Sequence, residues 1–123
     1  KQGDPYHCQC QKTTRLLKDR LGWDDTEITT TFQSRFGPEE WLKPYTVDEV
    51  ARLAEDGKKK IAVCAPAFSA DCIETLEEIN EEIRESFEEA GGEQFTYIPC
   101  LNDDEAHIAA LSQVIHENVN GWV

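Results

Sequence analysis

Two kinds of hydrophobic pattern alternate along this chain, and together they predict an α/β fold. Residues 61–68, IAVCAPAF, are almost continuously apolar, as expected for a strand that is covered on both faces in a parallel sheet. Residues 94–101, QFTYIPCL, predict a further strand, and residues 26–34 are rich in β-branched and aromatic residues, which favours a third. The segments between these runs carry apolar residues at the three- and four-residue spacing of helices.

Four helices are predicted around these strands, at about residues 7–21, 46–56 and 69–90, and from about residue 103 onward. The expected capping residues are Thr46 with Glu49 as a capping box, Ser69 or Asp71, and Asn102 or Asp103. Helices and strands then alternate with short connections, which predicts right-handed crossovers on a mostly parallel sheet. The sequence therefore predicts one α/β domain over residues 1–123, folded as a three-layer sandwich.

The helix predicted at residues 69–90 has one apolar and one strongly acidic face, and the acidic face has two interpretations. It is either a solvated surface or a row of carboxylates along a cleft that handles a cation. Glu74, Glu78 and Glu82 drift by about 40° per four residues on an ideal α-helix. A widened, π-type turn would bring them closer to one line, and such turns are frequent at functional sites. Desolvated carboxylates in a row raise one another's pKa, which would allow proton exchange near neutral pH.

Charge and cysteine content narrow the classes of partner. Asp and Glu number 25 against 12 Lys and Arg, a formal net charge of -13, which disfavours binding to nucleic acid and anionic lipids and favours cations. The five cysteines form no CxxC pair, and this odd count is typical of reduced thiols in the cytoplasm. The chain contains no Met and begins in a turn-like KQGDPY, so we expect it to be part of a longer polypeptide.

The candidate sites lie at the carboxyl ends of two predicted strands. Residues 33–44, QSRFGPEEWLKP, form a loop after the first strand, and residues 67–79 form the turn that enters the acidic helix. In a parallel sheet both ends lie on one edge, where open α/β folds bind ligands. No GxSxG, GxGxxG or GxxxxGK motif is present, and the three histidines are expected to be solvated on polar helix faces.

Four motifs in a fixed order resemble the carboxyl-terminal half of ferrochelatase in its proteobacterial form. They are GDPY (3–6), QSRFGPEEWLKP (33–44), PAFSADCIETLEEI (66–79) and YIPCLN (97–102). The resemblance implies a chelatase-like, Rossmann-type half of a two-domain enzyme whose other half precedes this chain. It also implies that the whole enzyme is a lyase that inserts Fe(II) into protoporphyrin IX in the last step of haem synthesis.

The resemblance also assigns roles to individual residues. Glu74 becomes the catalytic carboxylate, and Glu74, Asp71, Glu78 and Glu82 become the acidic path for metal or protons. Cys72 stands where many ferrochelatases have histidine, and we expect a structural role for it. The cleft wall that binds the porphyrin is implied to contain Trp41, Ser34, Arg35, Gly37 and Pro38.

The chemistry of metal insertion shows why these residue types are needed. Fe(II) must lose water while two pyrrole protons leave, so the site requires a metal-transfer ligand and a proton acceptor. The porphyrin propionates are anionic and are expected to contact Arg35 and Lys43. No cysteine follows Cys100, so we expect no [2Fe-2S] cluster and no other cofactor.

The expected partners are protoporphyrin IX, Fe(II) and the amino-terminal domain of the same polypeptide. Any contact with a membrane is expected through that missing half, and the isolated fragment is expected to be inactive. Two alternatives stay open: a non-catalytic porphyrin- or metal-binding module, and a small cobalt or nickel chelatase. The second would need its own histidine ligand in the cleft.

Overall fold

Two parallel strands form the centre of the computed structural model, which describes residues 3–34, 37–38 and 40–122. Strand β1 (Lys60–Cys64) pairs with β2 (Gln94–Ile98), with Ala62 opposite Thr96. Both strands come from the apolar runs that predicted them. The α/β class with a parallel sheet is therefore confirmed.

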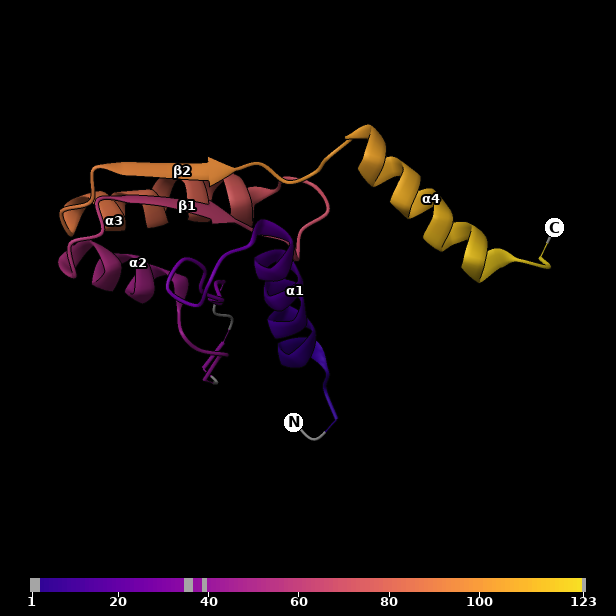
Figure 1. Ribbon diagram of the computed structural model, residues 1–123, viewed down its shortest axis with the longest axis horizontal. Coiled ribbons are helices and arrows are strands. Elements are labelled where there is room, and N and C mark those ends of the chain that lie inside the picture. The colour runs from indigo at the N-terminus through magenta and orange to yellow at the C-terminus, as the bar shows by residue number, and fades with distance from the viewer. Residues whose placement is uncertain (1–2, 35–36, 39, 123) are drawn as a thin grey trace.

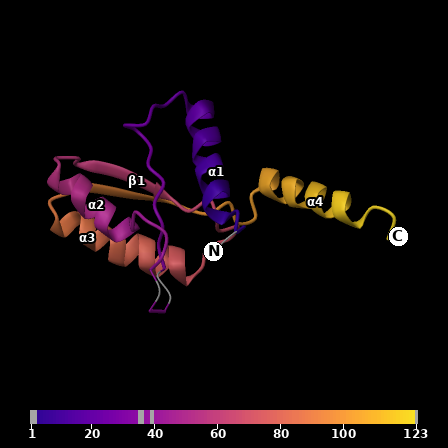
Figure 2. The same ribbon diagram turned by 90° about the horizontal axis from the view of Figure 1, so that it is seen from below.

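Helix α2 (Thr46–Glu55), the π-helix η1 (Glu74–Ile83) and helix α3 (Arg84–Glu89) pack on one face of this sheet. Figure 2 shows α2 and α3 together on one side of the strands. The residues that these elements bury form one hydrophobic core, because each contributes its apolar face. The core consists of Val50, Ala54, Ile79, Ile83, Phe87 and Phe95.

Helices α1 (Tyr6–Leu21) and α4 (Glu105–Val119) bury no residues within the described part of the chain. Figure 1 shows α4 projecting away from the sheet beyond the carboxyl end of β2. The second face of the sheet, with Ala62, Cys64, Thr96 and Ile98, is consequently exposed. The described residues therefore place a helical layer on one face only of the sheet, where the sequence predicted a layer on each.

The strand predicted at residues 26–34 is wrong. This segment forms only an isolated bridge between Phe32 and Tyr45. Its threonines bond to helices instead of a neighbouring strand: Thr30 Oγ1 lies 2.6 Å from Thr14 Oγ1, and Thr46 Oγ1 donates to Thr31 Oγ1 at 3.0 Å. β-branched residues favour a strand only where another strand lies alongside.

All three predicted caps are also wrong. Neither Ser69 nor Asp71 caps the acidic helix, because η1 begins without a side-chain cap. Thr46 uses its hydroxyl on Thr31, and Glu49 pairs with Arg52 at 2.6 Å, so the capping box at the start of α2 does not form. Helix α4 is capped by Asp104, whose Oδ1 accepts from the Ala106 amide at 2.9 Å. Within the described residues, no helix has the length and apolar character needed to cross a bilayer.

Candidate active site

The loop after residue 32 is joined to the acidic helix by hydrogen bonds, which we call the 33–34 clasp. The Ser34 amide donates to Glu78 Oε1 at 2.7 Å, and the Ser34 hydroxyl donates to Glu78 Oε2. Gln33 Nε2 donates to Glu78 Oε2 at 3.2 Å and to the Glu74 carbonyl at 2.7 Å. Ser34 reaches this position with a left-handed backbone, φ 57°. The two predicted candidate segments therefore meet.

The acidic helix begins with the widened turns that would bring its carboxylates closer to one line. Residues Glu74–Ile83 form a π-helix, and an α-helix follows from Arg84. The Glu74 and Glu78 side chains are half-buried, whereas Glu82 is exposed. The structure therefore contains the π-type turns whose effect on the carboxylates was considered from the sequence, and the row runs from half-buried Glu74 to exposed Glu82.

The pKa of Glu74 is shifted in the direction opposite to the one expected for a desolvated row of acids. A hydrogen bond with the Cys72 side chain is the largest cause, and it holds the Glu74 pKa below its usual value. A hydrogen bond from the backbone acts in the same direction, and the smaller effect of burial opposes both. Glu74 is therefore an ionised hydrogen-bond acceptor at neutral pH.

Asp71 lies just before this helix, and its carboxylate is already occupied by protein donors. Oδ1 accepts from the Tyr97 hydroxyl, from Thr75 Oγ1 at 3.0 Å and from the Cys100 amide at 3.3 Å. Oδ2 accepts from Asn102 Nδ2 at 2.8 Å. The Asn102 amide, followed by the Tyr97 hydroxyl, holds the pKa of Asp71 well below its usual range.

The four carboxylates of the predicted metal path, Asp71, Glu74, Glu78 and Glu82, do not form a compact metal site. Among residues 3–34, 37–38 and 40–122, no three His, Cys, Asp or Glu side chains come close enough together to hold a metal ion. Asp71, Glu74, Glu78 and Glu82 are therefore spread along a turn and a helix face. Their role as a metal or proton path stays a prediction.

A cleft of about 460 Å³ lies next to the clasp, whose Gln33 and Ser34 both line it. Helix α1, residues 30–34, Trp41 and the residues after β1 enclose it, and Ser34 and Trp41 both line it. Gly37 and Pro38, two other predicted members of the cleft wall, are exposed and do not line this cavity. Arg35 lies outside the described residues. The cleft has the size of a small-molecule pocket and contains apolar and hydroxyl groups.

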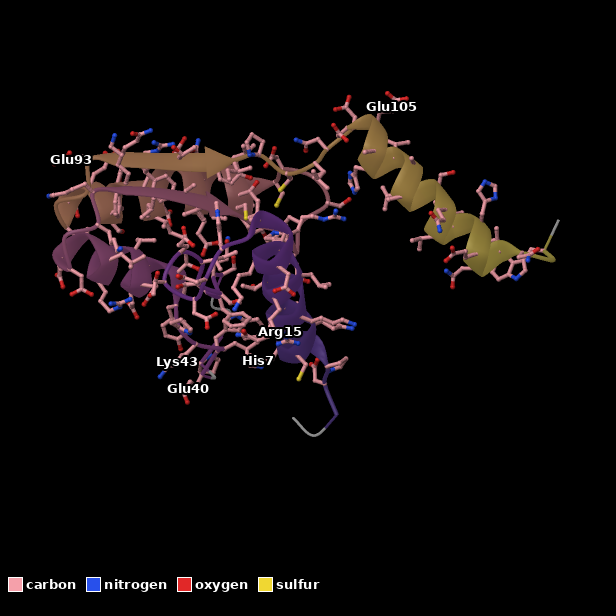
Figure 3. The ribbon with its side chains drawn as sticks, viewed as in Figure 1. His7, Arg15, Glu40, Lys43, Glu93 and Glu105 are labelled. Atoms are coloured by element: carbon pink, nitrogen blue, oxygen red, sulfur yellow. The ribbon has the colours of Figure 1, made fainter. Side chains whose placement is uncertain are left out.

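Lys43, which was expected to contact an anionic group of the ligand, lies at the edge of the same loop. Its Nζ lies 2.5 Å from Glu40 Oε1 and 5.7 Å from the centre of the Tyr45 ring. Figure 3 shows Lys43 and Glu40 side by side and far from α4. Both side chains of the pair are largely exposed, so the pair is a weak restraint on Lys43.

Several residues of the site were not identified from the sequence. Gln33 lines the cleft and also holds the Glu74 carbonyl, and Tyr97 and Asn102 hold Asp71. Tyr97 and Asn102 belong to the YIPCLN motif, so their place in that motif was the available signal. His107, expected to be solvated, is half-buried, and its Nε2 lies 3.0 Å from Ser69 Oγ.

The clasp makes a direct prediction for amide exchange at Ser34. Replacing Glu78 by alanine removes the acceptor of the Ser34 amide, and a hydrogen bond to a charged group contributes about 1.5–3 kcal/mol. We expect Glu78→Ala to accelerate hydrogen exchange of the Ser34 amide by about tenfold or more, measured by NMR. Glu81→Ala, at an exposed position on the same helix, is the control. Equal exchange in the two variants would contradict the clasp.

The lowered pKa of Asp71 makes a second prediction, for acid stability. A carboxyl whose pKa is lower in the folded state stabilises that state above its unfolded pKa of about 4, and the contribution disappears as pH falls towards the folded pKa. We expect Asp71→Asn to reduce the loss of stability between pH 7 and pH 3, measured by urea unfolding at each pH. Asp103→Asn, at an exposed position in the next loop, should keep the pH dependence of the unsubstituted chain.

Comparisons with known proteins identify the family to which the chain is similar. A family model described as Ferrochelatase matches residues 1–119. A ferrochelatase of Rhodobacter capsulatus is 72% identical over all 123 residues, which cover 35% of that relative. Ferrochelatases of Rhizobium etli (58% identity, 100% of this chain, 36% of the relative) and Marinobacter nauticus (59%, 98% and 32%) are also similar. The chain thus spans about a third of the length of the curated relatives that it matches.

Proposed function

The chain belongs to the ferrochelatase family, and we propose that it forms the acidic wall of the site where a full-length ferrochelatase inserts Fe(II) into protoporphyrin IX. In this proposal the chain is the carboxyl-terminal half of a two-domain lyase that acts in the last step of haem synthesis. The opposite wall of the site then comes from the part of the polypeptide that precedes this chain.

The 33–34 clasp is the observation that carries the proposal. Gln33 and Ser34 line the cleft with Trp41, and the same two residues bind the main chain of Glu74 and the carboxylate of Glu78. A ligand in the cleft would therefore lie against the segment that holds the acidic row. An apolar cavity next to carboxylates can bind a flat apolar ligand such as a porphyrin. The carboxylates can then take up the protons that the ligand releases and supply the cation that it binds.

In this proposal the acidic row, Glu74, Glu78 and Glu82, takes part in metal insertion, with Glu74 nearest to the porphyrin. Fe(II) replaces the two pyrrole N–H hydrogens of the macrocycle, so each turnover forms the metal–nitrogen bonds of haem and releases two protons. Glu74 is ionised and half-buried, and in this proposal it accepts those protons or passes the metal to the ring. Glu78 and the exposed Glu82 then connect Glu74 with solvent.

The remaining features of the proposal concern the substrate's periphery and the surroundings of the enzyme. Trp41 is 41% exposed in the cleft, and in the proposal its indole stacks on the porphyrin. Arg35 and Lys43 are proposed to bind the propionates, because the acidic helix would repel these anionic groups. We further propose that the enzyme acts in the cytoplasm. We also propose that these 123 residues hold no [2Fe-2S] cluster, since none of them after Cys100 is a cysteine.

The experiment that tests this function uses the full-length protein that carries this chain. Under anaerobic conditions with Fe(II) and protoporphyrin IX, we expect the absorbance of the free porphyrin to be replaced by that of haem at a rate proportional to enzyme. Tight binding of protoporphyrin without conversion would instead favour a non-catalytic porphyrin-binding module. Insertion of Co(II) or Ni(II) with no insertion of Fe(II) would favour a cobalt or nickel chelatase.

A further inference from the structure

The Tyr97 hydroxyl connects the end of β2 to the turn that precedes the acidic helix. It donates to Asp71 Oδ1, and its oxygen lies 3.6 Å from Cys100 Sγ. Burial, followed by the hydrogen bond to Asp71, raises the pKa of Tyr97, so the phenol keeps its proton and the carboxylate stays ionised. This charge-assisted bond joins two segments 26 residues apart in the sequence.

Asp71 transmits this restraint to the first turn of η1. Its Oδ1 lies 3.0 Å from the hydroxyl of Thr75, a residue with no exposed surface. The Thr75 hydroxyl in turn accepts from the Cys72 amide at 3.0 Å, so residues 71–75 form a closed ring of hydrogen bonds. Glu74 belongs to the segment that these hydrogen bonds hold. Its carbonyl also accepts a hydrogen bond from Gln33 Nε2, which is part of the 33–34 clasp.

Asn102 holds the opposite side of the same turn. Its Nδ2 donates to Asp71 Oδ2 at 2.8 Å, while its Oδ1 accepts from the Asp71 amide at 2.8 Å. Because protein donors occupy both carboxylate oxygens, binding of a metal by Asp71 would cost these hydrogen bonds. Asp71 is therefore better placed to fix the conformation of the turn before η1 than to transfer a cation.

We propose that Tyr97 is a positioning residue for Glu74 and acts through the Asp71 carboxylate and Thr75. The inference rests on the proposed function, because it gives Glu74 the role of proton acceptor or metal-transfer ligand. The Tyr97 hydroxyl does not touch the substrate in this proposal. It fixes the turn from which Glu74 projects, and small displacements of a reacting group reduce a rate strongly.

A double-mutant cycle in the full-length protein tests this role. Tyr97→Phe keeps the ring and removes only the hydroxyl, and we expect kcat for Fe(II) insertion to fall about tenfold with KM for protoporphyrin unchanged. In a Glu74→Gln background the same substitution should change the residual single-turnover rate by less than about twofold, because the residue that it positions has lost its charge. Tyr45→Phe is the matched control. It keeps the ring that lies under Lys43 Nζ, and the Tyr45 hydroxyl makes no hydrogen bond within the described part of the chain.

Each arm of the cycle gives a distinct result. A tenfold fall that persists in the Glu74→Gln background would overturn the inference, because Tyr97 would then act independently of Glu74. Full activity of Tyr97→Phe would overturn it as well. If the unsubstituted protein inserts no Fe(II), the proposed function itself fails, and the inference fails with it.

Discussion

Glu74→Gln in the full-length protein is expected to reduce Fe(II) insertion by about 10²–10⁴-fold, the usual contribution of a positioned proton acceptor. The substitution keeps the size of the side chain but removes the charge that Glu74 holds at neutral pH. Because glutamine keeps the size of the side chain, KM for protoporphyrin should change little. The measurement is steady-state haem formation at several porphyrin and Fe(II) concentrations.

Glu77→Gln provides the matched control for this substitution. Glu77 lies in the same π-helix and loses the same charge, but its side chain is exposed. We expect the rate of the control to stay within about twofold of the unsubstituted enzyme, as is usual for a surface position. Near-normal turnover by Glu74→Gln would remove Glu74 from the mechanism, and equal losses in both variants would indicate a general effect of helix charge.

Phe87→Ala is expected to have the largest effect on stability, a loss of about 3–5 kcal/mol in the free energy of unfolding. Phe87 has no exposed surface and lies at the centre of the core, with its ring centroid 6.1 Å from that of Phe95. A Cβ atom on Gly92 would lie 2.1 Å from the Phe87 ring, so the chain passes directly over it. Because the surrounding core is closely packed, it cannot move enough to fill the cavity that the substitution leaves. Urea unfolding followed by circular dichroism measures the change.

Two controls separate the cavity from the loss of apolar surface in general. Gly92→Ala adds a methyl group where the Phe87 ring already lies, and we expect it to destabilise the chain by about 1–3 kcal/mol through overpacking. Val47 lies in α2, and its side chain is 44% exposed, so Val47→Ala should lower the free energy of unfolding by less than about 1 kcal/mol. A cost for Phe87→Ala similar to that of Val47→Ala would contradict the central place of Phe87 in the core.

The sequence predicted those parts of the fold that depend on local pattern. The apolar runs became β1 and β2, and the acidic segment formed a helix, whose first part is the π-helix η1. The loop at residues 33–44 and the turn before Glu74 were expected at one edge of a parallel sheet, and the 33–34 clasp joins them. In each case the residues that carried the pattern also make the contacts.

The remaining features depend on contacts with residues that are distant in the sequence, and a local pattern does not show such contacts. Residues 26–34 have the composition of a strand, but the threonine hydroxyls there bond to α1 and to Thr46. Asp71 is a different case: the resemblance placed it on the metal path, and that role stays a prediction, but its hydrogen bonds were not foreseen. Its four hydrogen-bond donors come from Thr75 and from residues 97–102, a segment that the sequence does not place beside it.

The central claim is that Glu74 acts in metal insertion after the porphyrin is bound, and a single-turnover experiment tests it most directly. Full-length protein is saturated with protoporphyrin IX under anaerobic conditions and mixed rapidly with Fe(II), and haem absorbance is followed in Glu74→Gln and Glu77→Gln. The expected result is equal porphyrin binding in both variants, with haem formation at least about 100-fold slower in Glu74→Gln alone. Equal rates of haem formation in the two variants would contradict the claim.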